Sequence, residues 1–295
     1  MAYLYIINSQ LETAEFEARL GQLVGKVLAK TKNEPEFCKG LALVKIDEVE
    51  LLNIRSQLDN WQCDYVFSEL ELKPPKLVVF DMDSTLIPIE VIDELAQFAD
   101  KKAEVSQVTE LAMQGQLDFN QSLRQRVKHL KGLEQAVIQQ LAAELVFNPG
   151  VEAWCQYLIK QGSQVAIASG GFVPFAQALQ QTIDFSFIRA NQLAIESGKL
   201  TGEVVGTIIN AEEKAKALTE WASELAIDSS QCMAIGDGAN DLAMLQEAGI
   251  GLAYHAKPKV NQSASSVLKY ASMAALIDLF EFAGSSVKNC RKTNH

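Results

Sequence analysis

An apolar run that breaks abruptly into acidic residues constrains this chain more than any other feature. Residues 76–80, Lys-Leu-Val-Val-Phe, have the length and the β-favouring side chains of a buried strand. The next ten residues, 81–90, are Asp-Met-Asp-Ser-Thr-Leu-Ile-Pro-Ile-Glu. Because side chains alternate along an extended backbone, Asp81 and Asp83 are expected on the same side, just past the end of the strand.

Two carboxylates in one small space can do phosphoryl-transfer chemistry. Together they can coordinate a hard divalent cation, which keeps one carboxylate ionised as a nucleophile while the other transfers protons. A simpler alternative is that Asp and Ser are ordinary residues where a strand ends and a helix begins. An EF-hand calcium loop starting at Asp81 is excluded, because Leu86 occupies the position of the required Gly and Ile92 that of the Glu.

A second apolar strand is predicted at residues 164–169, and it ends in Ser169, Gly170 and Gly171. Glycines let backbone N–H groups approach an anion closely, and the serine adds a hydroxyl donor at the carboxyl end of the strand. The segment suits a phosphate cradle, although taken alone it could be a turn.

A helix is predicted to begin near residue 210, because Asn210 and Glu213 resemble a capping box. Lys214 in its first turn is unfavourable for the helix dipole by roughly 0.3 to 1 kcal/mol, which hints at a purpose other than helix stability. Lys216 could serve the same purpose. Without the other motifs, a lysine here would be interpreted as a solvated surface charge.

A further strand at residues 232–236 breaks into Gly-Asp-Gly-Ala-Asn-Asp, with Asp237, Asn240 and Asp241 in the turn. A dinucleotide fingerprint fails here, because Asp241 replaces the third glycine and would repel a pyrophosphate. A bound cation is the simpler explanation for this acidic turn.

These four segments, in this order, resemble those of the haloacid dehalogenase superfamily of aspartate-nucleophile phosphatases. Within that superfamily the chain is similar to the phosphoserine phosphatase family, through Glu90, the segment 118–127 and the late segment 252–260. The resemblance covers about residues 76–275. It implies hydrolysis of O-phospho-L-serine to L-serine and phosphate, the last step of serine biosynthesis.

The resemblance also implies a role for each matched residue of the reaction centre. Asp81 would attack phosphorus to form an aspartyl-phosphate, while Asp83 would protonate the leaving hydroxyl and later deprotonate the water. Magnesium, with manganese as a substitute, would be held by Asp81, the main-chain carbonyl of Asp83 and Asp237, with Asp241 orienting this shell. The residues that would gather the phosphate oxygens are Ser169, Gly170, Lys214 and, as a weaker candidate, Asn240.

Recognition of the small-molecule substrate, O-phosphoserine, would require groups for its ammonium and its carboxylate. The resemblance assigns Glu90 to the ammonium and Arg126 to the carboxylate as a bidentate fork. Arg124 is a competing fork. Met113 and Phe119 would shield the pocket, unless they are ordinary packing residues between cap helices.

Charge and composition exclude several other classes of partner and site. The net charge of −11 argues against a nucleic-acid partner, and no apolar run reaches the roughly 18 residues that suggest a membrane span. The amino-terminal residues do not resemble a secretory signal, so the cytoplasm is the expected location. The five cysteines and three histidines form no metal-ligand or catalytic pattern. A homo-oligomer is compatible with the sequence but not indicated by it.

The expected fold class is α/β, with a Rossmann-like core whose sheet is mostly parallel, an inserted helical cap and a small amino-terminal α+β domain. Residues 1–72 are expected to form that accessory domain, in the order strand-helix-strand-helix-strand. This order is one strand short of the regulatory amino-acid-binding fold attached to some phosphoserine phosphatases. Ligand sensing by this domain is therefore a hypothesis. Residues 73–76 are a linker with two prolines, and 77–284 are the phosphatase core. Residues 285–295 are predicted to be a disordered tail.

The cap is expected at about 89–147, with amphipathic helices at 90–99, 103–114, 120–130 and 133–145. A β-hairpin is expected at 192–205, around Ser197 and Gly198. Three alternative functions are compatible with the pattern: a phosphomutase or other phosphotransferase, a phosphatase for another small phosphomonoester, and a ligand-sensing protein without turnover.

Overall fold

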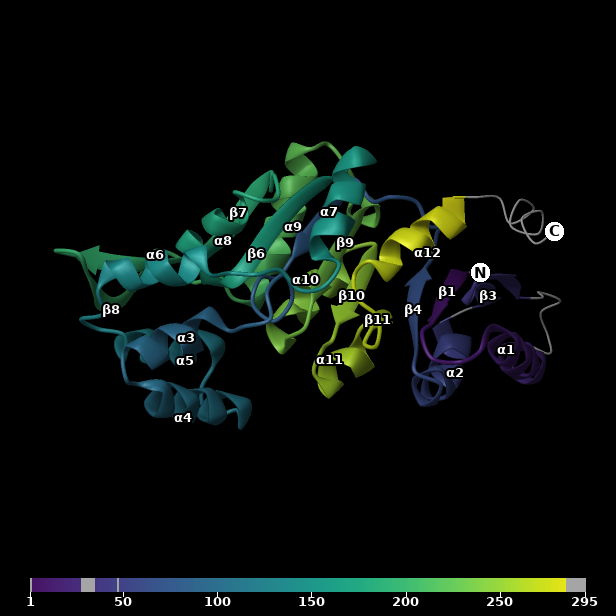
Figure 1. The fold of residues 1–295 in the computed structure, drawn as a ribbon, viewed down its shortest axis with the longest axis horizontal. Coiled ribbons are helices and arrows are strands. Elements are labelled where there is room, and N and C mark those ends of the chain that lie inside the picture. Colours follow the sequence, from purple (N-terminus) through teal and green to yellow (C-terminus); the bar gives the residue numbers. More distant parts are fainter. Residues whose placement is uncertain (1, 28–34, 47, 285–295) are drawn as a thin grey trace.

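A computed structural model describes residues 2–27, 35–46 and 48–284 of the chain. Within these residues the strands form one sheet, in the order β2-β3-β1-β4-β11-β10-β9-β5-β6-β7-β8, with helices on both sides (Figure 1). The predicted α/β class with a mostly parallel core is confirmed. In the described part of the chain, no helix combines the length and the apolarity that crossing a bilayer requires.

The centre of the sheet brings the predicted motifs to one edge. In β5 (Leu77–Phe80), Phe80 is in register with Ile167 of β6 (Gln164–Phe172) and Ile235 of β9 (Cys232–Gly236). Because these strands are parallel, the residues that follow all three emerge at the same carboxyl edge. The core continues through three further strands: β7 (Phe187–Glu196), β10 (Ile250–Tyr254) and β11 (Ser266–Leu268).

Two hydrophobic clusters cover the two faces of β5. Val78 and Phe80 belong to one cluster and Leu77 and Val79 to the other, as the period of two in a strand requires. The first cluster includes residues of α7 (Val151–Lys160), α8 (Val173–Leu179) and α12 (Ala275–Gly284). The second includes residues of α9 (Ala211–Glu224), α10 (Leu242–Glu247) and α11 (Pro258–Ser263), with short 3₁₀ turns at η1 (Ser229–Gln231) and η2 (Ala239–Asp241) between elements.

The predicted cap helices are present, each close to its expected range. They are α3 (Val91–Phe98), α4 (Lys102–Met113), α5 (Phe119–Lys128) and α6 (Gln135–Ala143). The predicted hairpin is also confirmed: β7 turns into β8 (Lys199–Val205) through Ser197 and Gly198, which have positive φ angles of 50° and 78°. Backbone hydrogen bonds from Gly132 to Leu200 and from Gln135 to Gly198 attach the cap to this hairpin.

The amino-terminal unit has one more strand than expected. Its elements are β1 (Ala2–Asn8), α1 (Thr13–Val27), β2 (Glu36–Cys38), β3 (Leu41–Ile46), α2 (Glu48–Asn60) and β4 (Cys63–Ser68). The predicted order omitted β2, because a three-residue strand shows no usable periodicity. It forms a hairpin with β3 through Lys39 and Gly40, both at positive φ. The resulting β-α-β-β-α-β order is a split βαβ unit.

This unit is joined to the core by more than the predicted linker. Residues 69–76, which include the predicted linker, connect β4 to β5. Strand β4 also pairs with β11 through Tyr65 and Val267, so the sheet is continuous across the expected boundary. The buried carboxylate of Asp64 accepts backbone hydrogen bonds from Lys269, Tyr270 and Ala271 at 2.6 to 3.1 Å. The predicted disordered tail lies outside the described residues.

Removing the Asp64 carboxylate should destabilise the fold more than removing a neighbouring exposed one. In Asp64→Ala, backbone donors of the core lose their acceptor, and we expect a loss of about 3 kcal/mol in the free energy of unfolding, measured by urea denaturation. The control is Asp59→Ala, whose half-exposed carboxylate pairs with Lys269 and should contribute less than about 1 kcal/mol. Equal losses in the two variants would contradict this account of the junction.

Candidate active site

The two aspartates of the first motif lie at the carboxyl end of β5 and are buried. Asp81 Oδ1 accepts a hydrogen bond from the N–H of Met82 at 2.7 Å. The loop that follows folds tightly, because the Met82 carbonyl accepts from the N–H groups of Leu86 and Ile87. This loop carries Asp83 beside Asp81 and delivers the chain to α3.

Lys214 reaches the same place from the first turn of α9. Asn210 caps this helix, and its side chain accepts from the N–H of Glu213 at 3.1 Å, which is one half of the predicted capping box. The Lys214 side chain is fully buried, and its Nζ lies 2.7 Å from Asp81 Oδ1 and 2.7 Å from Asp241 Oδ1. Lys216 is instead half-exposed and lies 3.8 Å from two surface glutamates. The structure therefore excludes the surface interpretation for Lys214 and removes Lys216 as the competitor.

Three aspartates from two strand ends converge beside the lysine. One carboxylate oxygen from each of Asp81, Asp237 and Asp241 lies within 4.8 Å of the others. Both oxygens of Asp241 have protein donors, because Oδ1 accepts from Lys214 and Oδ2 from the N–H of Gly238 at 2.9 Å. Asp237 Oδ1 accepts from the hydroxyl of Thr85 at 3.2 Å. Asp81 and Asp237 line the cavity described below, whereas Asp241 lies behind them.

The electrostatics of this cluster show an excess of negative charge. Burial, followed by the nearby Asp241 carboxylate, raises the pKa of Asp81 well above its usual range although Lys214 opposes the shift. Burial and the proximity of Asp241 raise the pKa of Asp237 to about 6. Burial and the neighbouring Glu90 raise the pKa of Asp83 well above its usual range. A divalent cation with a preference for oxygen ligands fits such a set of donors.

The glycine motif lies beside the aspartates, at the end of the neighbouring strand β6. Strand β6 extends three residues beyond the predicted end at 169, and a register irregularity falls between Ala168 and Phe172. Ser169 is fully buried behind the cavity, and its Oγ accepts from the N–H of Gly171 at 2.8 Å. A Cβ on Gly171 would lie 2.6 Å from Met82 Cε and 3.1 Å from Asp83 Oδ2. A side chain at Gly171 would therefore displace the end of Met82 and crowd the Asp83 carboxylate, so glycine keeps this strand close to the aspartates.

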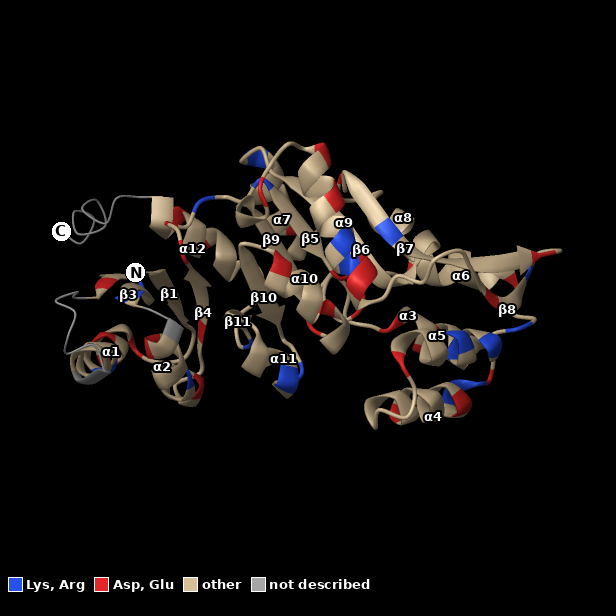
Figure 2. Cartoon of the chain, turned by 180° about the vertical axis from the view of Figure 1, so that it is seen from behind, with Lys and Arg blue, Asp and Glu red and all other residues tan. Residues whose placement is uncertain are grey.

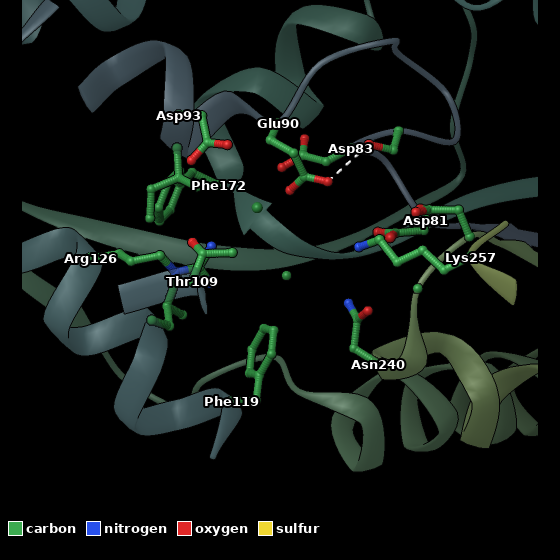
Figure 3. A pocket seen from close by; sticks show the side chains of 17 residues that line it. Asp81, Asp83, Glu90, Asp93, Thr109, Phe119, Arg126, Phe172, Asn240 and Lys257 are labelled. Carbon is green, nitrogen blue, oxygen red and sulfur yellow. Dashed lines mark hydrogen bonds between the residues drawn. The ribbon is translucent and has the colours of Figure 1, made fainter. Parts of the chain in front are cut away.

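A cavity of about 440 Å³ joins the core motifs to the cap (Figure 3). Figure 3 shows Asp81, Asn240 and Lys257 at one end of it, and Arg126 with Thr109 at the other. The predicted site residues that line this cavity are Asp81, Asp83, Glu90, Phe119, Arg126, Gly170, Asp237 and Asn240. Its lining contains both the predicted phosphate end and the predicted amino-acid end.

Helix α5 presents one face to the cavity. Asp118 caps it in a complete capping box with Gln121. Phe119, Leu123 and Arg126, which are spaced four and three residues apart, line the cavity. Arg124 is exposed on another face, so the structure separates the two competing arginines.

Glu90 lies at the N-cap position of α3 and accepts a hydrogen bond from the hydroxyl of Ser84 at 2.9 Å. Burial lowers the pKa of Arg126, and the carboxylates of Glu90 and Asp93 oppose this shift. An acidic group and a guanidinium are thus placed close enough to influence each other at the cap end.

Met113 does not lie where it was expected. Its side chain is 77% exposed and is absent from the cavity lining. Met113 is the last residue of α4, and the residue of α4 that lines the cavity is Thr109, one turn earlier. The prediction that Met113 shields the pocket is wrong, because Met113 lies on a face of α4 that points away from the cavity. Phe119 does lie against the cavity, 2.9 Å from the position of a Cβ added to Gly170.

Several polar residues of the site were not predicted, among them Thr85, Asp93 and Lys257. Thr85 binds Asp237 and belongs to the first motif, where its hydroxyl was the available signal. Asp93 lies three residues after Glu90, on the same helical face, and lines the cavity. Lys257 follows β10 in the late segment that carried part of the resemblance, and it also lines the cavity.

A parallel sheet with paired aspartates at its carboxyl edge and an inserted helical cap defines a haloacid dehalogenase-like hydrolase, and the model of that family matches residues 75–249. Phosphoserine phosphatase from Haemophilus influenzae is 48% identical over 209 residues, which cover 71% of this chain and 67% of that protein. The chain belongs to the phosphoserine phosphatase family of these hydrolases. It is an enzyme that hydrolyses phosphoric monoesters.

Solved structures agree over nearly the whole chain. The unliganded structure of a probable phosphoserine phosphatase from Vibrio cholerae has a TM-score of 0.76 at 31% identity, covering 98% of this chain and 88% of that one. A HAD family hydrolase from Salmonella enterica serovar Typhi has a TM-score of 0.85 at 28% identity, covering 95% of this chain and 99% of that one. The similarity therefore includes the amino-terminal unit as well as the core.

The contrast between Lys214 and Lys216 can be tested with two matched substitutions. Lys214→Met removes the charge that holds Asp81 and Asp241, so kcat on an aryl phosphate should fall by at least about 100-fold. Lys216→Met changes the net charge equally but should leave kcat within twofold. Comparable losses in both variants would contradict the assignment of Lys214 to the reaction centre.

Proposed function

We propose that this enzyme is a magnesium-dependent phosphoserine phosphatase that releases L-serine and phosphate from O-phospho-L-serine, the last step of serine biosynthesis. One observation carries the proposal: a single cavity is lined by the Asp81 and Asp83 pair with Glu90 beside Asp83, and Arg126 lies toward its other end (Figure 3). Relatives named phosphoserine phosphatase at 42 to 48% identity support it. The expected cytoplasmic location is compatible with this reaction.

In the first step, a carboxylate oxygen of Asp81 attacks phosphorus, and the bond from phosphorus to the seryl oxygen breaks. Lys214, 2.7 Å away, favours the ionised carboxylate that this attack requires. Asp83 is suited to give the proton to the departing seryl oxygen, because its raised pKa favours the protonated form. Its Oδ1 is buried and has no hydrogen-bond partner in the described residues, which leaves it available for this role.

In the second step, water attacks the aspartyl-phosphate and Asp83 takes its proton, so that phosphate leaves and Asp81 is regenerated. The Gly170 N–H and Asn240 are positioned to donate to phosphate oxygens, because both residues line the cavity. Ser169 is better placed to shape the cradle, since its hydroxyl already accepts from Gly171.

Asp81 and Asp237, with the main-chain carbonyl of Asp83, would hold the magnesium ion, and Asp241 would orient them from behind. The ion would supply positive charge that offsets the crowded carboxylates and the phosphoryl oxygens. Manganese suits the same oxygen donors.

The decisive experiment is phosphate release from L-phosphoserine beside a panel of sugar, nucleotide and aryl phosphates, each with magnesium and with a chelator. We expect a strong preference for phosphoserine that the chelator removes, and no turnover by Asp81→Asn despite an unchanged circular dichroism spectrum. Activity confined to other esters would sink the substrate assignment. Phosphoryl return to an organic acceptor, detected by product analysis, would favour a phosphotransferase instead.

The amino-acid end of the cavity can be tested with two arginines of the same helix. Arg126→Ala should lower kcat/KM for phosphoserine by about 100-fold or more, because a charge-assisted pair to the substrate carboxylate is lost. For an aryl phosphate without a carboxylate, the loss should be below about threefold. Arg124→Ala serves as the control and should match the wild type on both. Equal losses on the two substrates would rule out the carboxylate fork.

A further inference from the structure

Lys257 is a cavity residue for which the local fold has no evident use. It is the N-cap residue of the short helix α11, yet its side chain accepts no capping hydrogen bond, as a lysine cannot. Its backbone N–H donates to the carbonyl of Asp237 at 3.2 Å, which anchors it next to the acidic turn. The backbone is therefore fixed beside the reaction centre, while the side chain is not needed for the helix.

The Lys257 side chain extends into the cavity from the phosphoryl end. Figure 3 shows it beside Asp81 with its amino group directed toward the middle of the cavity, opposite Arg126. Lys257 is exposed, and its charge opposes the rise in the pKa of nearby Asp237, which burial causes. In the described part of the chain, its amino group forms no ion pair within 4 Å of a carboxylate. In Figure 2, basic residues are blue, and blue segments lie at α11.

Negative charge predominates among the residues that line the cavity, so a cation at position 257 affects how an anionic substrate binds. Five carboxylates line the cavity, from Asp81, Asp83, Glu90, Asp93 and Asp237. The cations that line it are Arg126, at the cap end, and Lys257. Lys214, which the resemblance assigned to the phosphate oxygens, does not line the cavity. It is fully buried, and its two ion-pair partners are carboxylates. At the phosphoryl end, Lys257 is thus the lining residue whose ammonium group is available to bind an anionic substrate.

We propose that Lys257 binds a non-bridging oxygen of the substrate phosphoryl group and draws the anionic substrate into an otherwise acidic cavity. This deepens the proposed function and depends only on a phosphoryl group being present, not on the serine part. An ammonium on a flexible stem suits this task, since it can follow the phosphoryl group as the substrate enters. Because the side chain is exposed, its attraction is screened by salt.

The test compares Lys257→Met with Lys259→Met, since Lys259 is an exposed lysine of α11 that does not line the cavity. Both variants change the net charge equally. With phosphoserine and an aryl phosphate at saturating magnesium, Lys257→Met should lower kcat/KM at least tenfold for both, mainly through KM. Lys259→Met should stay within twofold. The decrease of kcat/KM between 20 and 300 mM salt should be smaller in Lys257→Met than in the wild type.

Inorganic phosphate provides a readout that needs no turnover of phosphoserine. Its competitive inhibition constant against the aryl phosphate should rise about tenfold in Lys257→Met, and Lys257→Arg should recover most of the difference. Melting temperatures within 2 °C of the wild type, by calorimetry, would exclude misfolding, with Lys257→Gln as the second variant if Met fails.

Each contrary result is informative. Equal kinetics in Lys257→Met and Lys259→Met would overturn the proposal. A loss confined to phosphoserine would also overturn it, because it would place the contact at the carboxylate. If the wild type hydrolyses the aryl phosphate but not phosphoserine, the proposed substrate fails, and the phosphate inhibition constant still decides the role of Lys257.

Discussion

The buried ion pairs between Lys214 and two aspartates hold the reaction centre together. Asp81 and Asp241 come from two different strand ends, and one ammonium group lies 2.7 Å from an oxygen of each. Burial and mutual repulsion alone would favour protonated carboxyls at this edge of the sheet. The lysine offsets part of that repulsion, and its carboxylate partners raise its pKa although burial would lower it. Without such a cation, this density of buried carboxylates would be costly to fold.

The parallel sheet supplies the geometry that this cluster requires. Because β5, β6 and β9 are in register, the nucleophile, the glycine cradle and the acidic turn meet at one carboxyl edge. Close approach is possible only where side chains are absent, as at Gly236, where an added Cβ would lie 2.4 Å from Asp241 Cγ. The cap then covers the other side, with α5 contributing two apolar residues and one cation, Arg126. The site is therefore shared between a rigid sheet edge and a helical insertion.

Much of this arrangement could be predicted from local sequence, and the failures have two physical origins. The cap helices, the hairpin at Ser197 and Gly198, and the acidic strand ends follow from periodicity, turn preferences and capping, which depend on near neighbours. The three-residue strand β2 was missed because it is too short to show a period. Met113 was misplaced, and Lys257 overlooked, because the orientation of a helix or loop toward a distant cavity leaves no local mark.

By itself, the sequence determined the α/β class, the order of the motifs and the residue types at each strand end, since these depend on backbone geometry and on chemistry within a few residues. Only the tertiary structure decided which of two lysines is buried among the aspartates, which of two arginines lines the cavity, and that the amino-terminal sheet is continuous with the core. The physical reason is that Lys214 and Lys216, like Arg124 and Arg126, have the same charge and similar intrinsic preferences. What distinguishes the members of each pair is the packing of distant segments against the helix that carries them.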